Sequence, residues 1–197
     1  MVIGEVWEDG STKVAYGVRR RHILGGHCDG LMNYPFRTAL LAYLSGGDAD
    51  DFREAMETLR ENYPPAAFYS AMNFLGTHDT PRILTVLGAD TVPQSKDERA
   101  MYRLTPAQRL KAAALVRLAA LVLFTFPGSP MVYYGDEAGM EGFEDPFNRR
   151  TFPWGREDPE LLDWFTRLGH LRQESAALRR GDIRYRASDG PLLAFTR

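Results

Sequence analysis

Residues 70–82 read SAMNFLGTHDTPR and contain the pattern that decides the fold. The run 70–75 has the length and apolar character of a buried strand. Two side chains with reactive chemistry, His78 and Asp79, follow it after a glycine and a threonine. In α/β barrels the reactive groups stand just beyond the carboxyl ends of the strands. Taken alone, a His–Asp pair after a strand is more often a helix cap or a structural hydrogen-bond pair, so its meaning depends on the rest of the chain.

Similar short runs recur along the chain and alternate with longer amphipathic segments. We predict further strands at 2–6, 30–34 and 131–134. Apolar spacing and capping residues predict helices at 50–62, at 105–123 and from Asp158 onward, the last of them ending at Gly181. This alternation is typical of a parallel α/β architecture.

Three other stretches lack that alternation. Residues 183–187 and 192–196 flank a Ser-Asp-Gly sequence and predict a β-hairpin. Residues 88–103 and 139–154 are predicted to be loops, because they are polar or interrupted by glycine and proline.

Composition restricts the possible partners. The chain has 197 residues, 44% of them hydrophobic, which is enough for one sizeable core. With 24 basic and 26 acidic residues it has no cationic excess for nucleic acid or an anionic membrane, so a neutral partner fits better. The single Cys28 excludes an internal disulfide framework. Since nothing at Met1 resembles a signal peptide, we expect a cytoplasmic protein.

A second acid stands at the end of the first predicted strand. Residues 4–7 read GEVW, which places Glu5 beside Trp7. The two residues suit a glycosidase site, in which a carboxyl group works beside an aromatic face. They also suit a strand-end salt bridge next to a packing tryptophan, and the segment alone leaves both interpretations open.

Three further segments resolve that choice when they are read in order. They are MNYPF at 32–36, FPGSPMVYYGDEAGM at 126–140 and DPFNRR at 145–150. Together with the segments around Glu5 and Asp79 they resemble the α-amylase family, glycoside hydrolase family 13, and especially its neopullulanase and cyclomaltodextrinase-like members. The resemblance covers nearly the whole chain. It implies that residues 1–180 are the C-terminal half, strands five to eight, of a (β/α)8 TIM barrel, and that residues 181–197 begin a C-terminal β-sandwich domain.

The resemblance implies two catalytic carboxyl groups. Glu5 matches the general acid/base, which protonates the leaving oxygen and later deprotonates the attacking water. Asp79 matches the aspartate that holds sugar hydroxyls and stabilises the transition state.

It also implies how the sugar is bound. His78 and Trp7 match sugar-binding residues, and Asp145 with Arg149 matches the pair that holds the next sugar. Arg82 suits either a salt bridge inside the rim or a substrate contact.

The family's nucleophile is missing from the sequence. Family members carry an Asp-x-x-x-Asn-His and a Gly-x-Arg-x-Asp segment earlier in the chain, and neither precedes Glu5. We therefore expect a part of a retaining α-glucan hydrolase that cleaves α-1,4 and in some members α-1,6 bonds, inactive as an isolated chain. We also expect self-association through the exposed barrel edges.

The remaining expectations concern ligands and an alternative function. The expected substrate is a maltooligosaccharide or a cyclodextrin. We expect no cofactor and no metal, because the family's calcium ligands lie mostly in segments that the sequence lacks, and the spacing of His22, His27 and Cys28 matches no common zinc pattern. The alternative is a non-catalytic amylase-like domain for interaction or carbohydrate binding. Retention of Glu5, His78 and Asp79 favours the enzyme.

Overall fold

The computed structural model describes all residues from 1 to 197 and divides into two compact units. The first unit comprises residues 1–74, 125–131 and 175–197, and the second comprises residues 75–124 and 132–174. Each unit is therefore built from segments that are far apart in the sequence.

The first unit contains most of the strands. Its elements, in chain order, are β1 (Ile3–Gly4), β2 (Val14–Ala15), β3 (Val18–Arg19), β4 (Gly30–Leu31), α1 (Tyr34–Leu44), α2 (Ala49–Asn62), α3 (Pro65–Ser70), β5 (Met72–Phe74), β6 (Ser129–Met131), α8 (Ala176–Arg180), β7 (Arg184–Asp189) and β8 (Leu192–Thr196).

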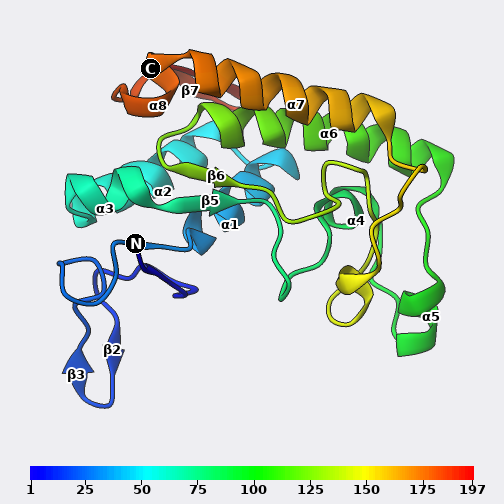
Figure 1. Ribbon diagram of the computed structural model, residues 1–197, viewed down its shortest axis with the longest axis horizontal. Helices are drawn as coiled ribbons and strands as arrows, with labels where there is room; N and C mark the ends of the chain where they lie inside the picture. Colours follow the sequence, from blue (N-terminus) through cyan, green and yellow to red (C-terminus); the bar gives the residue numbers. More distant parts are fainter. The chain divides into compact units, whose positions relative to one another are not determined.

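Four of these strands are parallel and follow one another in chain order. β1 pairs with β4, and β5 pairs with β6, both in parallel. A parallel bridge between Met32 and Met72 joins the two pairs. The adjacent β5 and β6 can be followed in Figure 1. Helices separate β4 from β5 and β5 from β6, as predicted, whereas β1 and β4 are separated by the antiparallel pair β2 and β3 and by no helix.

The predicted strands were too long at their ends. Residues 30–34 were expected to be a strand, but Tyr34 already begins α1. The strand expected at 131–134 lies earlier in the chain, since β6 spans Ser129–Met131. Helix α1 was missed by the sequence analysis. Asn33 caps it, because its Oδ1 accepts the backbone N–H of Phe36 at 3.1 Å, and a proline occupies its first turn.

An aromatic cluster forms the core of the first unit. Phe36, Phe52 and Phe126 are at most 1% exposed, and their ring centroids lie between 5.3 and 6.0 Å apart. They join α1, α2 and the segment that precedes β6. Burial of three phenylalanines contributes several kcal/mol, about 1.5–3 kcal/mol for each side chain.

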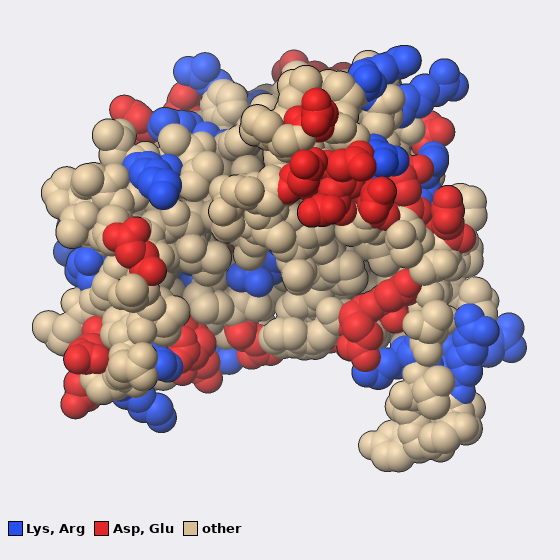
Figure 2. Space-filling view, turned by 180° about the vertical axis from the view of Figure 1, so that it is seen from behind, with Lys and Arg blue, Asp and Glu red and all other residues tan.

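Helix α2 and the C-terminal hairpin confirm two predictions. Asp48 caps α2 by accepting the backbone N–H of Asp50 at 2.8 Å, and acidic residues fill the first turn, where they favour the helix dipole. Figure 2 shows acidic side chains gathered where α2 lies. Strands β7 and β8 form the expected antiparallel hairpin, and Ser188 on β7 donates to Asp50 at 2.7 Å.

The second unit is helical. Its elements are α4 (Ile83–Gly88), α5 (Lys96–Met101), α6 (Pro106–Thr125, whose last residue belongs to the first unit), the 3-10 helix η1 (Phe147–Arg149) and α7 (Pro159–Glu174). None of the helices combines the length and the apolar character needed to cross a membrane.

Helices α6 and α7 run alongside each other in Figure 1. The rings of Phe124 and Phe165 meet edge-on at 6.1 Å, and the indole N–H of Trp164 donates to the carbonyl of Arg117 at 2.9 Å. The predicted cap of α6 is confirmed, since the Thr105 hydroxyl accepts the backbone N–H of Gln108 at 3.3 Å.

Two boundaries differ from the prediction. Helix α5 lies inside 88–103, which was expected to be a loop, and begins with a capping box between Ser95 and Glu98. Gly181 does not end α7. That helix ends at Glu174, and Gly181 ends the short α8, where its N–H donates to the carbonyl of Ala177 at 2.6 Å.

Candidate active site

A carboxylate stands directly beyond β1 in the first unit. The exposed Glu5 follows Gly4, the last residue of the strand. Its Oε1 accepts the hydroxyl of Tyr34 at 2.8 Å and the indole N–H of Trp7 at 3.2 Å. The structure assigns no hydrogen bond to Oε2. One oxygen of the carboxylate is thus held in place while the other is accessible to a ligand.

The tryptophan beside Glu5 has a fixed orientation. Trp7 stacks on Tyr34 with a centroid distance of 4.3 Å and an interplanar angle of 16°. Tyr34 is buried and meets Phe74 of β5 edge-on at 4.8 Å, so it anchors the pair to the core. Trp7 itself remains 54% exposed and offers an aromatic surface to a ligand.

Two buried asparagines tie the strand ends of the first unit together. Asn33 donates from Nδ2 to Asn73 Oδ1 at 2.8 Å, and Asn73 donates to the carbonyl of Pro127 at 2.6 Å. The sequence analysis did not single out either residue as functional. The position of the polar Asn73 inside an apolar run could have indicated its role, because a buried amide requires hydrogen-bond partners.

In the second unit, Arg149 joins three of the predicted site residues. Its guanidinium lies 3.3 Å from Asp79 Oδ1 and 3.0 Å from Asp145 Oδ1, and its Nε donates to the carbonyl of His78 at 3.1 Å. The His78 Nε2 lies 3.4 Å from the other oxygen of Asp79. All four residues therefore form one cluster, and both oxygens of Asp79 face a nitrogen donor.

Beneath this cluster lies a fully buried arginine. Arg82 is 0% exposed, donates from Nε to the carbonyl of Asn148 at 2.7 Å, and lies 3.1 Å from Asp136 Oδ1. Its guanidinium also stands over the rings of Tyr133 and Tyr134, at 4.3 and 4.6 Å. Of the two interpretations of Arg82, the internal salt bridge is therefore correct, since a residue without exposed surface does not contact a substrate.

Burial also affects the neighbouring phenol. It raises the pKa of Tyr133, and the positive charge of Arg82 only partly opposes that shift. Tyr133 consequently stays neutral at physiological pH and presents an uncharged ring to the guanidinium.

The loop that carries Arg149 is tied to the segment that carries Asp79. Asn148, which is buried, donates from Nδ2 to the carbonyls of His78 and Thr80, each at 2.8 Å. Asn148 was not singled out by the sequence analysis. Its position one residue before Arg149 explains its role, because fixing the backbone here also fixes the neighbouring guanidinium.

The model of the alpha-amylase catalytic domain matches residues 1–177. The chain belongs to the α-amylase family. It also has the α/β-barrel-type fold of that family, as predicted from the sequence.

Relatives within the family bear names of α-glucan hydrolases. The chain is 36% identical over 208 residues to an amylopullulanase of Thermoanaerobacter thermohydrosulfuricus, covering 100% of this chain and 13% of the relative. It is 33% identical over 192 residues to a cyclomaltodextrinase of Geobacillus thermopakistaniensis, covering 95% and 27%. The chain thus spans less than a third of the length of these relatives.

Solved structures support the same family. A cyclic alpha-maltosyl-(1→6)-maltose hydrolase from Arthrobacter globiformis superposes with a TM-score of 0.75 at 28% identity, covering 95% of this chain and 37% of the hydrolase. A protein from Thermus thermophilus superposes with a TM-score of 0.78 at 30% identity, covering 99% and 39%.

Family membership gives both clusters a common context. Glu5 and Trp7 meet in the first unit, while His78, Asp79, Asp145 and Arg149 meet in the second. Their catalytic and sugar-binding roles stay predictions. The structure adds the residues that orient them, among them Tyr34 and Asn148.

Proposed function

We propose that this chain is the part of a retaining α-glucan hydrolase that carries the general acid/base and the residues that hold the sugar. In this proposal residues 1–180 are strands five to eight of the (β/α)8 barrel, and residues 181–197 begin the C-terminal β-sandwich. Four parallel strands in chain order and the hairpin that follows α8 support it. So does coverage of 37% of the Arthrobacter hydrolase structure and 39% of the Thermus thermophilus structure.

The observation that carries the proposal is the setting of Glu5. A general acid/base must hold its carboxyl group in one direction and still exchange a proton with the substrate. Tyr34 and Trp7 restrain Oε1 through hydrogen bonds of 2.8 and 3.2 Å, and Oε2 has no protein partner. Retaining glycosidases use such a carboxyl group first as acid and then as base.

The second cluster supplies the proposed sugar contacts. Arg149 holds Asp79 in one orientation, so that the carboxylate can accept sugar hydroxyls and stabilise positive charge in the transition state. His78 supplies a hydrogen-bond donor to the sugar ring that Asp79 contacts. Asp145 and Arg149 hold the next sugar.

The proposed substrates are maltooligosaccharides or cyclodextrins, cleaved at α-1,4 glucosidic bonds, with α-1,6 bonds as a second candidate. Relatives named cyclomaltodextrinase and amylopullulanase support an α-glucan as the substrate. An uncharged saccharide also agrees with the formal net charge of −2.

The isolated chain is expected to be inactive. Retaining glycosidases need a second carboxyl group about 5–5.5 Å from the acid/base to attack the anomeric carbon. No Gly-x-Arg-x-Asp segment, which carries the nucleophile in the family, precedes Glu5, and Asp79 matches a different role. Release of reducing ends from maltotriose or a cyclodextrin by the 197-residue chain should therefore not exceed the buffer blank.

Co-expression with a nucleophile-bearing half-barrel of a relative provides the positive control, since it should restore hydrolysis. Turnover by the isolated chain would contradict the proposal if that turnover disappeared in Glu5→Gln. Turnover that survived this substitution would come from a contaminating enzyme. Sequencing the reading frame upstream of Met1 provides independent evidence on the missing segment.

Self-association of the isolated chain is a second expectation. β1 pairs only with β4, and β6 pairs only with β5, so each has an unpaired edge. Unpaired edges attract strands of other chains. We expect size-exclusion chromatography with light scattering to show dimers or larger species that increase with concentration. Val2→Lys, which puts a charge beside β1, should reduce them. A monomer at every concentration would contradict this expectation.

A further inference from the structure

Four arginines line one cavity of the second unit that has no part in the proposed reaction. Arg103, Arg109, Arg150 and Arg156 surround a volume of about 480 Å³. The only acidic side chain in the lining is Glu141. The local charge is therefore positive, although the whole chain carries a formal net charge of −2.

Arg109 and Glu141 largely neutralise each other. Arg109 Nη1 lies 2.7 Å from Glu141 Oε1, and its Nη2 lies 3.2 Å from Asp158. The second oxygen of Glu141 accepts the backbone N–H of Leu104 at 2.9 Å. Glu141 is thus held by Arg109 and by the backbone, and it is the one acidic side chain that faces the remaining arginines of the lining.

The other three arginines form no ion pair with the protein. Arg150 donates from Nη2 to the carbonyl of Ala100 at 2.6 Å. Arg103 donates from Nη1 to the carbonyl of Tyr102 at 2.5 Å and more weakly to that of Ala100 at 3.4 Å. Two guanidinium groups thus converge on one neutral oxygen. A guanidinium carries five N–H donors, so most donors of Arg150 and Arg103 remain available, and Arg156 has no side-chain hydrogen bond.

This arrangement costs free energy unless an anion is present. Burial, and then the positive charge of Arg103, lower the pKa of Arg150, and the negative charge of Glu141 only partly opposes that shift. Like charges at this range repel, and the repulsion is stronger in a partly buried site than in water. An anion between the guanidinium groups would turn that repulsion into attraction.

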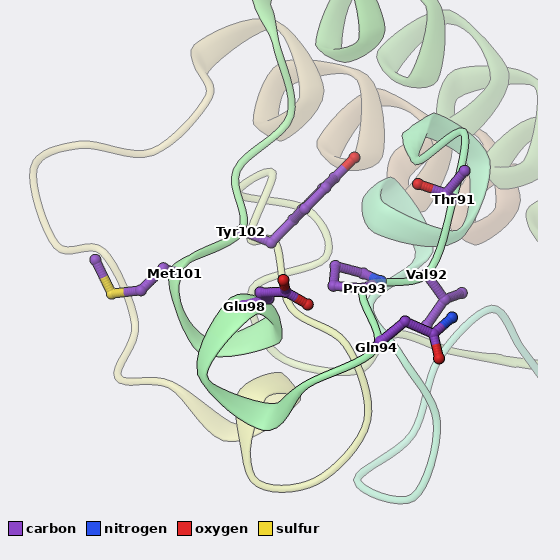
Figure 3. Close-up of a pocket in the computed structure, with 7 residues that line it drawn as sticks. All are labelled: Thr91, Val92, Pro93, Gln94, Glu98, Met101 and Tyr102. Carbon is purple, nitrogen blue, oxygen red and sulfur yellow. The ribbon is translucent and has the colours of Figure 1, made fainter.

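Other cavities of the second unit lack this excess of cations. One shares Arg109 and Arg156 and adds Arg117, but Glu157, Asp158 and Glu160 balance these charges. Another has no cation at all. That cavity, of about 620 Å³, is lined by residues between 91 and 102 (Figure 3). Its only charged lining residue is Glu98, which accepts the backbone N–H of Ser95 at 3.1 Å. It has no cation in its lining and no electrostatic reason to hold an anion.

We propose that the arginine-lined cavity binds a phosphate group, either as inorganic phosphate or as the phosphomonoester of a sugar. Guanidinium groups bind phosphate through pairs of charge-assisted hydrogen bonds. The volume lies within the usual range of small-molecule sites, about 300–1,000 Å³, and therefore leaves space for a sugar attached to the phosphate. The proposal does not depend on the hydrolase activity.

The test is isothermal titration of the 197-residue chain with inorganic phosphate at low ionic strength. We expect saturable binding to one site. Arg150→Gln should weaken it about tenfold or more, since a hydrogen bond to a charged group contributes roughly that factor. Added sodium chloride should weaken it further, because the guanidinium groups are partly exposed to solvent. Arg180→Gln serves as the matched control, because Arg180 is exposed, forms no ion pair and lies in α8.

Glucose 6-phosphate distinguishes the two sources of the phosphate group, and glucose serves as the control that lacks a phosphate. Binding of glucose 6-phosphate competitive with phosphate would identify a phosphomonoester site, whereas binding of phosphate alone would identify a site for the free anion. The proposal is overturned if phosphate gives no saturable heat, or if Arg180→Gln weakens binding as much as Arg150→Gln. Circular dichroism verifies that both variants are folded, and an Arg103→Gln/Arg156→Gln variant repeats the test if Arg150→Gln is not.

Discussion

Replacing Arg82 with methionine will lower the free energy of unfolding by about 3–5 kcal/mol, the usual effect of removing one partner of a buried ion pair. Arg82 is 0% exposed, and Asp136, which lies 3.1 Å away, is also buried. The substitution removes the cation that faces this carboxylate. It also removes the donor that holds the carbonyl of Asn148. Urea denaturation of the two chains measures the difference.

A surface pair provides the matched control. Arg167 lies 2.8 Å from Asp163, but their side chains are 70% and 59% exposed. Arg167→Met should therefore change the stability by only about 0–1 kcal/mol. The Arg82→Met/Asp136→Asn variant also removes the carboxylate charge that faced Arg82. Part of the stability lost in Arg82→Met should therefore return in this variant. An Arg82→Met effect no larger than that of the control would show that the buried pair does not stabilise the fold.

The second large effect concerns catalysis. Once the nucleophile-bearing half is supplied, Glu5→Gln should lower kcat by about 10²–10⁴-fold, because glutamine cannot transfer the proton to the leaving oxygen. The fold should not change, since the side chain is exposed and the amide oxygen can still accept the hydroxyl of Tyr34. Initial rates with maltotriose or a cyclodextrin measure the effect.

A substrate with an acidic leaving group tests the role of the proton directly. Such a leaving group departs without protonation, so the first step should be much less affected by Glu5→Gln than it is with maltotriose. Glu8→Gln controls for a change of charge nearby, because Glu8 is exposed and pairs with Lys13. The rate of the Glu8→Gln variant should stay within about twofold of that of the unsubstituted chain, as expected for a surface substitution. Equal rates for Glu5→Gln and Glu8→Gln would exclude Glu5 as the acid/base.

Features that depend on local spacing were predicted well. The apolar stripe and the acidic first turn identified α2, and the threonine–glutamine pair identified the start of α6. The Ser-Asp-Gly turn identified the β7–β8 hairpin. In each case residues within a few positions of one another determine the conformation, so their order in the sequence is sufficient.

Features that depend on packing were predicted less well. The run 30–34 ends in a tyrosine and was expected to be a strand throughout, but Tyr34 opens α1 and turns its hydroxyl to Glu5. Strand lengths were overestimated because apolar runs continue past the residues that pair. Whether such residues pair depends on a neighbouring strand, which local spacing does not specify.

The sequence by itself determined the family, the order of the segments that resemble it and the residues predicted to carry the chemistry. The tertiary structure decided which of those residues meet. Arg149 reaches Asp79 across 70 positions of the chain, and Arg82 reaches Asp136 across 54. It also resolved the role of Arg82, which the sequence left open between a substrate contact and a salt bridge. The physical reason is that hydrogen bonds and ion pairs between distant segments depend on how helices and loops pack, and sequence spacing carries no information about those distances.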